Sequence, residues 1–99
     1  MVKHVILWKL KEMPTDERNA VKANMKQHLE ALKGKIPGLL AIEVHIAPLD
    51  SSTVDVMLDT TFENADALKN YASHPDHVFV ADTYVRPFTA VRSCMDCEC

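Results

Sequence analysis

The stretch Tyr71-Ala72-Ser73-His74-Pro75-Asp76-His77-Val78 places a phenol and two imidazoles around a forced break in a helix. Pro75 has no backbone N–H and disfavours the α conformation at His74, so one helix is expected to end just before His74 and another to begin at Pro75. Tyr71, His74 and His77 recur at every third position, and the break can turn their side chains toward a common point. The stretch therefore predicts both a change of chain direction and a candidate site.

The segments on either side of this stretch predict a helix before it and a strand after it. Asn64 can cap a helix that carries Tyr71 on its apolar side, and a short helical turn through residues 78–81 follows the break. Residues 89–98 then alternate between two faces, as a strand does. One face carries Val91, Ser93, Met95 and Cys97, and the other carries Arg92, Cys94, Asp96 and Glu98.

The first part of the chain predicts a strand and a long helix. Residues 2–10 are rich in β-forming side chains and have large apolar groups on both faces, which indicates a strand covered on both sides. One face carries Val5 and Leu7, and the other carries His4, Ile6 and Trp8. Thr15 is the expected N-cap of a helix that ends at Gly34. Its apolar stripe consists of Val21, Met25, Leu29, Leu32 and Ile36.

Two further strands complete the predicted fold. Residues 40–47, with Leu40 at an apolar position, and residues 53–59 each alternate apolar and polar side chains, and a turn joins them into a hairpin. The resulting order is the βαββαβ pattern of the ferredoxin-like α+β fold, a four-stranded antiparallel sheet with two helices on one face. Because the other face carries Val5 and Leu7, we expect a homodimer in which two sheets pack into a dimeric α+β barrel.

Composition limits the partners and the compartment. The 99 residues suit one domain, residues 1–99, and 47% hydrophobic with 25% charged residues is ordinary for a globular protein. The net charge is -3 and the basic residues are scattered, so neither a nucleic acid nor a membrane is an expected partner. The apolar run at the N-terminus is too short for a secretory signal, and the cysteines do not form the dispersed framework of a secreted scaffold. We expect a cytoplasmic protein.

Three segments together carry a resemblance to a known family. They are Val2-Lys3-His4-Val5-Ile6-Leu7-Trp8-Lys9, the stretch at 71–78, and Asp82-Thr83-Tyr84-Val85-Arg86-Pro87-Phe88. In order and spacing the chain resembles the stress-responsive A/B barrel domain family, Dabb, over its whole length. The resemblance implies a dimeric α+β barrel with a small apolar cavity.

One enzyme branch of that family, the plant olivetolic acid cyclase type, is the nearest that the chain resembles. Enzymes of this type close a linear polyketide by an intramolecular aldol condensation without a cofactor, and the resemblance assigns the catalysis to Tyr71 and His77. It also places His4 at the same cavity. Val56 stands where the cyclase carries a histidine, so the acid–base pair transfers to this chain and the particular substrate does not. The implied function is a cofactor-independent cyclase or isomerase acting on a polyketide-like carbonyl compound; the alternative is a non-catalytic, stress-associated structural protein.

The chemistry of the candidate site is simple. A neutral imidazole can remove a proton alpha to a carbonyl near pH 7, and a phenol can donate a hydrogen bond to the enolate oxygen. We expect His77 to be the base and Tyr71 the donor, with His4, His74 and Trp8 in contact with a small apolar or aromatic substrate. The structural alternative is that His74 bonds to backbone at the break and His77 packs under the neighbouring loop. Tyr71 would then be a core aromatic with its hydroxyl satisfied, and Trp8 a core residue.

The cysteines near the C-terminus, Cys94, Cys97 and Cys99, raise a second alternative. Their thiolates could hold zinc or take part in redox chemistry. In a strand, however, Cys94 points away from Cys97, so the three sulfurs do not share a face. We therefore expect neither a metal nor a cofactor, and we interpret the segment as a solvent-exposed strand end.

Overall fold

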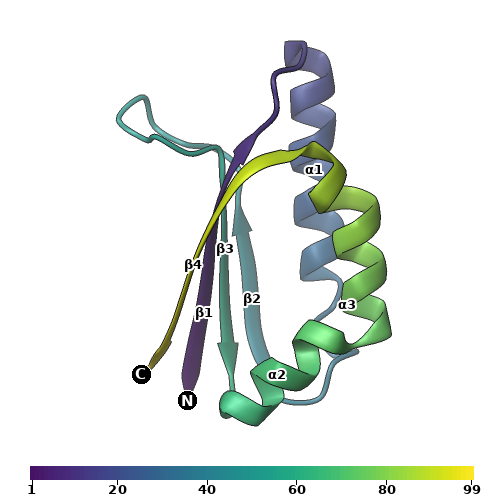
Figure 1. Cartoon of the computed structure of the whole chain (residues 1–99), viewed down its shortest axis with the longest axis vertical. Helices are drawn as coiled ribbons and strands as arrows, with labels where there is room; N and C mark the ends of the chain where they lie inside the picture. Colours follow the sequence, from purple (N-terminus) through teal and green to yellow (C-terminus); the bar gives the residue numbers. More distant parts are fainter.

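The computed structural model describes residues 1–99, which form four strands and the helices that connect them. Their bounds are β1 (Val2–Leu10), α1 (Thr15–Glu30), β2 (Leu39–His45), β3 (Val56–Phe62), α2 (Ala65–Ser73), α3 (Pro75–Val80), a π-helical turn η1 (Ala81–Val85), a 3-10 turn η2 (Arg86–Phe88) and β4 (Thr89–Glu98). The strands form one antiparallel sheet in the order β2-β3-β1-β4. The helices all lie on one side of it (Figure 1). This confirms the predicted ferredoxin-like α+β fold. None of the helices is both long and apolar enough to cross a membrane.

The two faces of β1 have different surroundings, and the single chain covers only one of them. Alternate residues point toward the helices and are buried, namely Val2, His4, Ile6, Trp8 and Leu10. Val5 and Leu7 lie on the other face and are half-buried. On the helical side, α1 packs onto the sheet through Val21, Met25 and Leu29. The core therefore lies between the helices and the sheet, and the face of β1 that carries Val5 and Leu7 is left open in the single chain.

The chain break at Pro75 has the predicted form. His74 is extended, with φ -65° and ψ 133°, and Pro75 begins α3. Asn64 caps α2 by accepting a hydrogen bond from the Ala67 N–H at 2.8 Å. After α3 the chain continues through η1 and η2 before it enters β4 (Figure 1).

The long helix differs from its prediction at both ends. Thr15 is the first helical residue rather than the cap, since Pro14 precedes the helix and no side chain caps it. The helix ends at Glu30, and hydrogen-bonded turns continue to Gly34, whose φ of +86° favours glycine. Leu32 and Ile36 are nevertheless buried as predicted, because the turns keep them against the core.

The hairpin strands are displaced from their predicted positions. In β2 the register shifts between Leu39 and Ala41, so Leu39 is buried and Leu40 is exposed, which corrects the predicted alternation. In β3 the strand begins at Val56, three residues later than predicted, and continues to Phe62. This extension buries Thr60, whose hydroxyl donates a 2.6 Å hydrogen bond to the backbone oxygen of His4. A satisfied hydroxyl removes the cost of burying a polar side chain.

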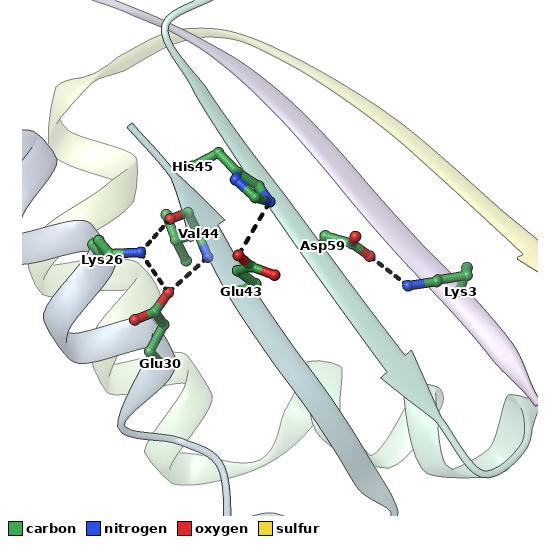
Figure 2. A network of polar contacts seen from close by, with 7 residues as sticks. All are labelled: Lys3, Lys26, Glu30, Glu43, Val44, His45 and Asp59. Atoms are coloured by element: carbon green, nitrogen blue, oxygen red, sulfur yellow. Dashed lines mark hydrogen bonds and ion pairs between the residues drawn. The ribbon is translucent and has the colours of Figure 1, made fainter. Parts of the chain in front are cut away.

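A pair of charged side chains joins α1 to the edge strand β2. The Lys26 ammonium donates to the backbone oxygen of Val44 at 2.7 Å, and the Glu30 carboxylate accepts from the Val44 N–H at 2.9 Å (Figure 2). Lys26 and Glu30 also bond to each other at 2.9 Å. These contacts occupy backbone groups of Val44 that would otherwise be free to pair with another strand.

Candidate functional site

A cavity of about 180 Å³ lies between the helical face of β1 and the helices around the break. Its wall includes four of the five residues singled out in the sequence: His4 and Trp8 from β1, Tyr71 from α2 and His77 from α3. Arg86 and Arg92 complete one side. The break at Pro75 thus allows two consecutive helices, α2 and α3, to line the same cavity.

Tyr71 lies deepest among these residues, with 1% of its surface exposed. Its ring centroid is 4.1 Å from that of His77 and 5.0 Å from that of Phe62. The Tyr71 hydroxyl is the only buried side-chain nitrogen or oxygen that lacks a hydrogen-bond partner. Burial raises the pKa of the phenol, so the hydroxyl keeps its proton and remains a donor. A ligand oxygen in the cavity would satisfy it.

His77 has its tautomer set by the backbone. Its Nδ1 lies 3.3 Å from the carbonyl oxygen of Ala72. A carbonyl oxygen can only accept, so Nδ1 carries the proton and Nε2 keeps its lone pair. Burial lowers the pKa of His77, and the positive charges of Arg86 and Arg92 lower it further. The ring is therefore neutral near pH 7, as a general base must be.

The lowered pKa of His77 is directly measurable. We expect its NMR titration midpoint below the ordinary value of 6.5, because the half-buried ring beside Arg86 and Arg92 binds a proton less readily than a free imidazole. As pH falls, the ring stays neutral until the pH passes below 6.5 and then gains its charge. Arg92→Gln should move the midpoint upward, whereas Lys9→Gln, on the face of β1 opposite the cavity residue Trp8, should not. A midpoint above 6.5 would contradict the assigned environment.

His4 and Trp8 also have defined positions. His4 is 7% exposed, its ring lies edge-on to Tyr71 with centroids 6.1 Å apart, and its Nδ1 contacts the carboxylate of Asp96. Trp8 is 4% exposed and belongs to the core cluster while lining the cavity. Trp8 therefore packs in the core, as the structural alternative states, and contact of His4 or Trp8 with a substrate stays a prediction.

His74 is the one predicted site residue that does not line the cavity. Its Nδ1 accepts a hydrogen bond from the Asp76 N–H at 3.1 Å and caps α3. The break that brings Tyr71 and His77 together turns the His74 ring back onto its own backbone. The prediction that His74 joins Tyr71 and His77 at a common point is therefore wrong, and the backbone alternative describes this residue.

Sequence reasoning missed the surroundings of His4 on β4. Asp96 pairs directly with His4 across the two strands, and Cys94 lies on the same face two residues earlier. Cys97 pairs with Lys3 on the opposite face, so Cys94 and Cys97 diverge as predicted. The alternation of β4 indicates that Cys94 and Asp96 share a face, but only the register with β1 shows that His4 lies beside them.

Comparisons with known proteins assign this chain to a family. A search of curated proteins gives no match. The Dabb family, Stress responsive A/B Barrel Domain, matches residues 2–99. A solved dimeric protein of unknown function with a ferredoxin-like fold, from Bacteroides fragilis, is 35% identical with a TM-score of 0.91, and the match covers 98% of this chain and 94% of that one.

Two more distant structures share the fold. A Dabb family protein from Mesorhizobium loti is 18% identical with a TM-score of 0.75, covering 98% of this chain and 94% of that one. A hydroxynitrile lyase from Passiflora edulis is 12% identical with a TM-score of 0.71, covering 96% and 89%. At such identities the likeness concerns the fold alone. The family match, in contrast, spans almost the whole chain, and the protein belongs to the stress-responsive A/B barrel (Dabb) domain family.

Proposed function

We propose that this protein is a cofactor-independent cyclase or isomerase that moves a proton alpha to the carbonyl of a small apolar or aromatic compound. The observation that carries the proposal is the buried Tyr71 hydroxyl without a partner, beside a neutral His77 in one cavity. A buried unsatisfied polar group costs about 1–3 kcal/mol. A substrate oxygen that accepts from Tyr71 would remove that cost in the complex.

The reaction assigns one step to each residue. His77 Nε2 accepts the proton from the carbon alpha to the carbonyl. The electrons of the broken C–H bond form the new C=C bond, and the π electrons of the carbonyl move onto its oxygen. The Tyr71 O–H donates a hydrogen bond to that enolate oxygen. The enolate then takes one of two courses. When it is conjugated, it can take the proton back from His77 at another carbon, which is isomerisation. Otherwise it attacks a second carbonyl carbon of the same molecule, which closes a ring, and the resulting alkoxide takes the proton back from His77.

The size and charge of the cavity limit the substrate. A dry protein cavity of about 150 Å³ holds a benzene molecule, so a space of about 180 Å³ suits a single ring with a short side chain. Arg86 is paired with Asp82, but Arg92 has no carboxylate partner within the chain. An unpaired guanidinium at the wall favours a ligand with an anionic group near its carbonyl.

The test uses ring-sized ketones as probes of proton abstraction. Phenylacetone, acetophenone and cyclohexanone are incubated with the protein in D₂O, and exchange of their alpha protons is followed by NMR. The proposal expects faster exchange than in buffer for at least one ketone that also saturates the protein. No acceleration with any probe, and no small-molecule mass retained in native mass spectrometry of the purified protein, would favour the non-catalytic structural function.

We also propose that the protein acts as a cytoplasmic homodimer whose sheets pack face to face. The open face of β1 carries the half-buried Val5 and Leu7, and the neighbouring strand β4 presents Met95, 66% exposed, on the same face. The 35% identical relative is described as dimeric. The three cysteines are free and exposed, which fits a reducing compartment.

The dimer can be tested with two matched substitutions. Met95→Glu puts a charge on the proposed interface and should convert the dimer to a monomer at micromolar concentration, because the charge would be buried without a partner. Phe79→Glu is the control, since Phe79 is 62% exposed and lies in α3 on the helical side. Sedimentation velocity measures both variants. A monomeric parent protein, or equal effects of the two substitutions, would contradict the proposed interface.

A further inference from the structure

Three side chains of types that can bind a metal ion lie close together beside the cavity, on the paired neighbouring strands β1 and β4. His4 on β1 pairs with Asp96 on β4, and Cys94 lies on the same face of β4. The Cys94 sulfur is 3.8 Å from His4 Nδ1 and 3.6 Å from an oxygen of Asp96, and that oxygen also contacts His4 Nδ1. The three ligand atoms all lie within 4.8 Å of one another.

These separations are close to those of a tetrahedral zinc site. With zinc–ligand bonds of about 2.0–2.3 Å, sulfur, nitrogen and oxygen ligands at tetrahedral angles lie about 3.3–3.6 Å apart. The two distances from Cys94 nearly meet this condition. Only the contact between His4 and Asp96 must widen, and the Asp96 side chain, 46% exposed, is free to turn. We propose that His4, Cys94 and Asp96 bind a thiophilic divalent cation, with Zn²⁺ as the expected ion.

The donor set matches such an ion in charge and chemistry. A thiolate and a carboxylate supply two negative charges, and a neutral imidazole supplies the third donor. On binding, the Cys94 thiol releases its proton to water, and the His4 proton that faces Asp96 from Nδ1 is exchanged through solvent to Nε2, so that Nδ1 can coordinate. No electron is transferred.

His4 is held in place for this role by its surroundings. Its ring is packed edge-on to Phe62 and Tyr71, and its backbone oxygen accepts a hydrogen bond from the buried Thr60 hydroxyl. A fixed ligand lowers the ordering cost of binding. Three protein ligands leave one coordination position for water, as in sites where zinc stays accessible. Because His4 also lines the cavity, the ion would lie at its edge.

The experiment uses Co²⁺, which gives a thiolate-to-metal charge-transfer band when sulfur coordinates it. Cys97→Ser/Cys99→Ser removes the thiols outside the cluster and is the starting protein. We expect it to bind one Co²⁺ per chain with that band, and excess Zn²⁺ should abolish the band by displacement. Loss of a residue that merely supports a ligand costs about 10–100-fold in affinity. Adding Cys94→Ser should therefore abolish the band and weaken binding at least about 100-fold.

Two exposed acids on the same strand face provide a matched comparison. Asp96→Asn should weaken Co²⁺ binding at least about tenfold, and Glu98→Gln should leave it unchanged. Circular dichroism confirms that each variant is folded. Absence of the band in Cys97→Ser/Cys99→Ser, its persistence after Cys94→Ser, or equal effects of Asp96→Asn and Glu98→Gln would overturn the site. These readouts do not involve ketone exchange, so this inference and the proposed function can fail separately.

Discussion

Tyr71→Phe is expected to make the free protein more stable and the proposed reaction much slower. Removing the hydroxyl eliminates the single buried polar side-chain atom without a partner, so the free energy of unfolding should rise by about 1 kcal/mol. The same change removes the donor to the enolate oxygen, and loss of one such donor lowers a rate by about 100- to 1000-fold. Urea unfolding and alpha-proton exchange of the best ketone probe measure the two effects.

The other tyrosine of the chain is the control for Tyr71. Tyr84 stacks on His28 with ring centroids 3.8 Å apart and does not line the cavity. Tyr84→Phe should therefore change stability by less than about 0.5 kcal/mol and leave exchange unaffected. If Tyr71→Phe instead destabilised the protein by 1 kcal/mol or so, its hydroxyl would have a partner within the folded chain, and the observation behind the proposed function would be lost.

His77→Ala is expected to remove the base and with it most of the proton abstraction. General base catalysis by a positioned side chain contributes about 100- to 10,000-fold to a rate. In the cavity wall, His77 is the imidazole whose Nδ1 is bonded to the Ala72 carbonyl oxygen and whose Nε2 is left to accept a proton. His4, the other imidazole of the cavity wall, lies farther from Tyr71, with ring centroids 6.1 Å apart rather than 4.1 Å. Exchange of the ketone probe should fall toward the rate in buffer, while binding of the ketone itself weakens only modestly.

His74→Ala separates this effect from a loss of structure in the same segment. His74 caps α3 and does not line the cavity, so the substitution should lower the free energy of unfolding by about 0.5–2 kcal/mol and leave exchange intact. His77 makes a single backbone hydrogen bond, and its loss should cost a similar amount of stability. Equal exchange rates in the two folded variants would show that His77 has a structural role only.

The sequence predicted the positions of some site residues better than others, because some positions depend on neighbours along the chain and others on contacts that the folded chain makes. That Tyr71 and His77 approach one another follows from the local break at Pro75, where one proline fixes the backbone of its neighbours. The position of His74 also follows from the break, but the break alone allows its ring either to line the cavity or to cap α3. The free N–H of Asp76 decided between them, since an imidazole nitrogen two residues away reaches it without other rearrangement.

By itself, the sequence determined the element order, the apolar side chains on both faces of β1, the limits of β4 and the break before α3. These features follow from side-chain periodicity and from the steric rules of single residues, which act between neighbours along the chain. Only the tertiary structure decided that Tyr71 has no hydrogen-bond partner and that His4 meets Cys94 and Asp96. Those contacts depend on the register between strands at opposite ends of the chain, which is set by packing of the whole core rather than by any local pattern.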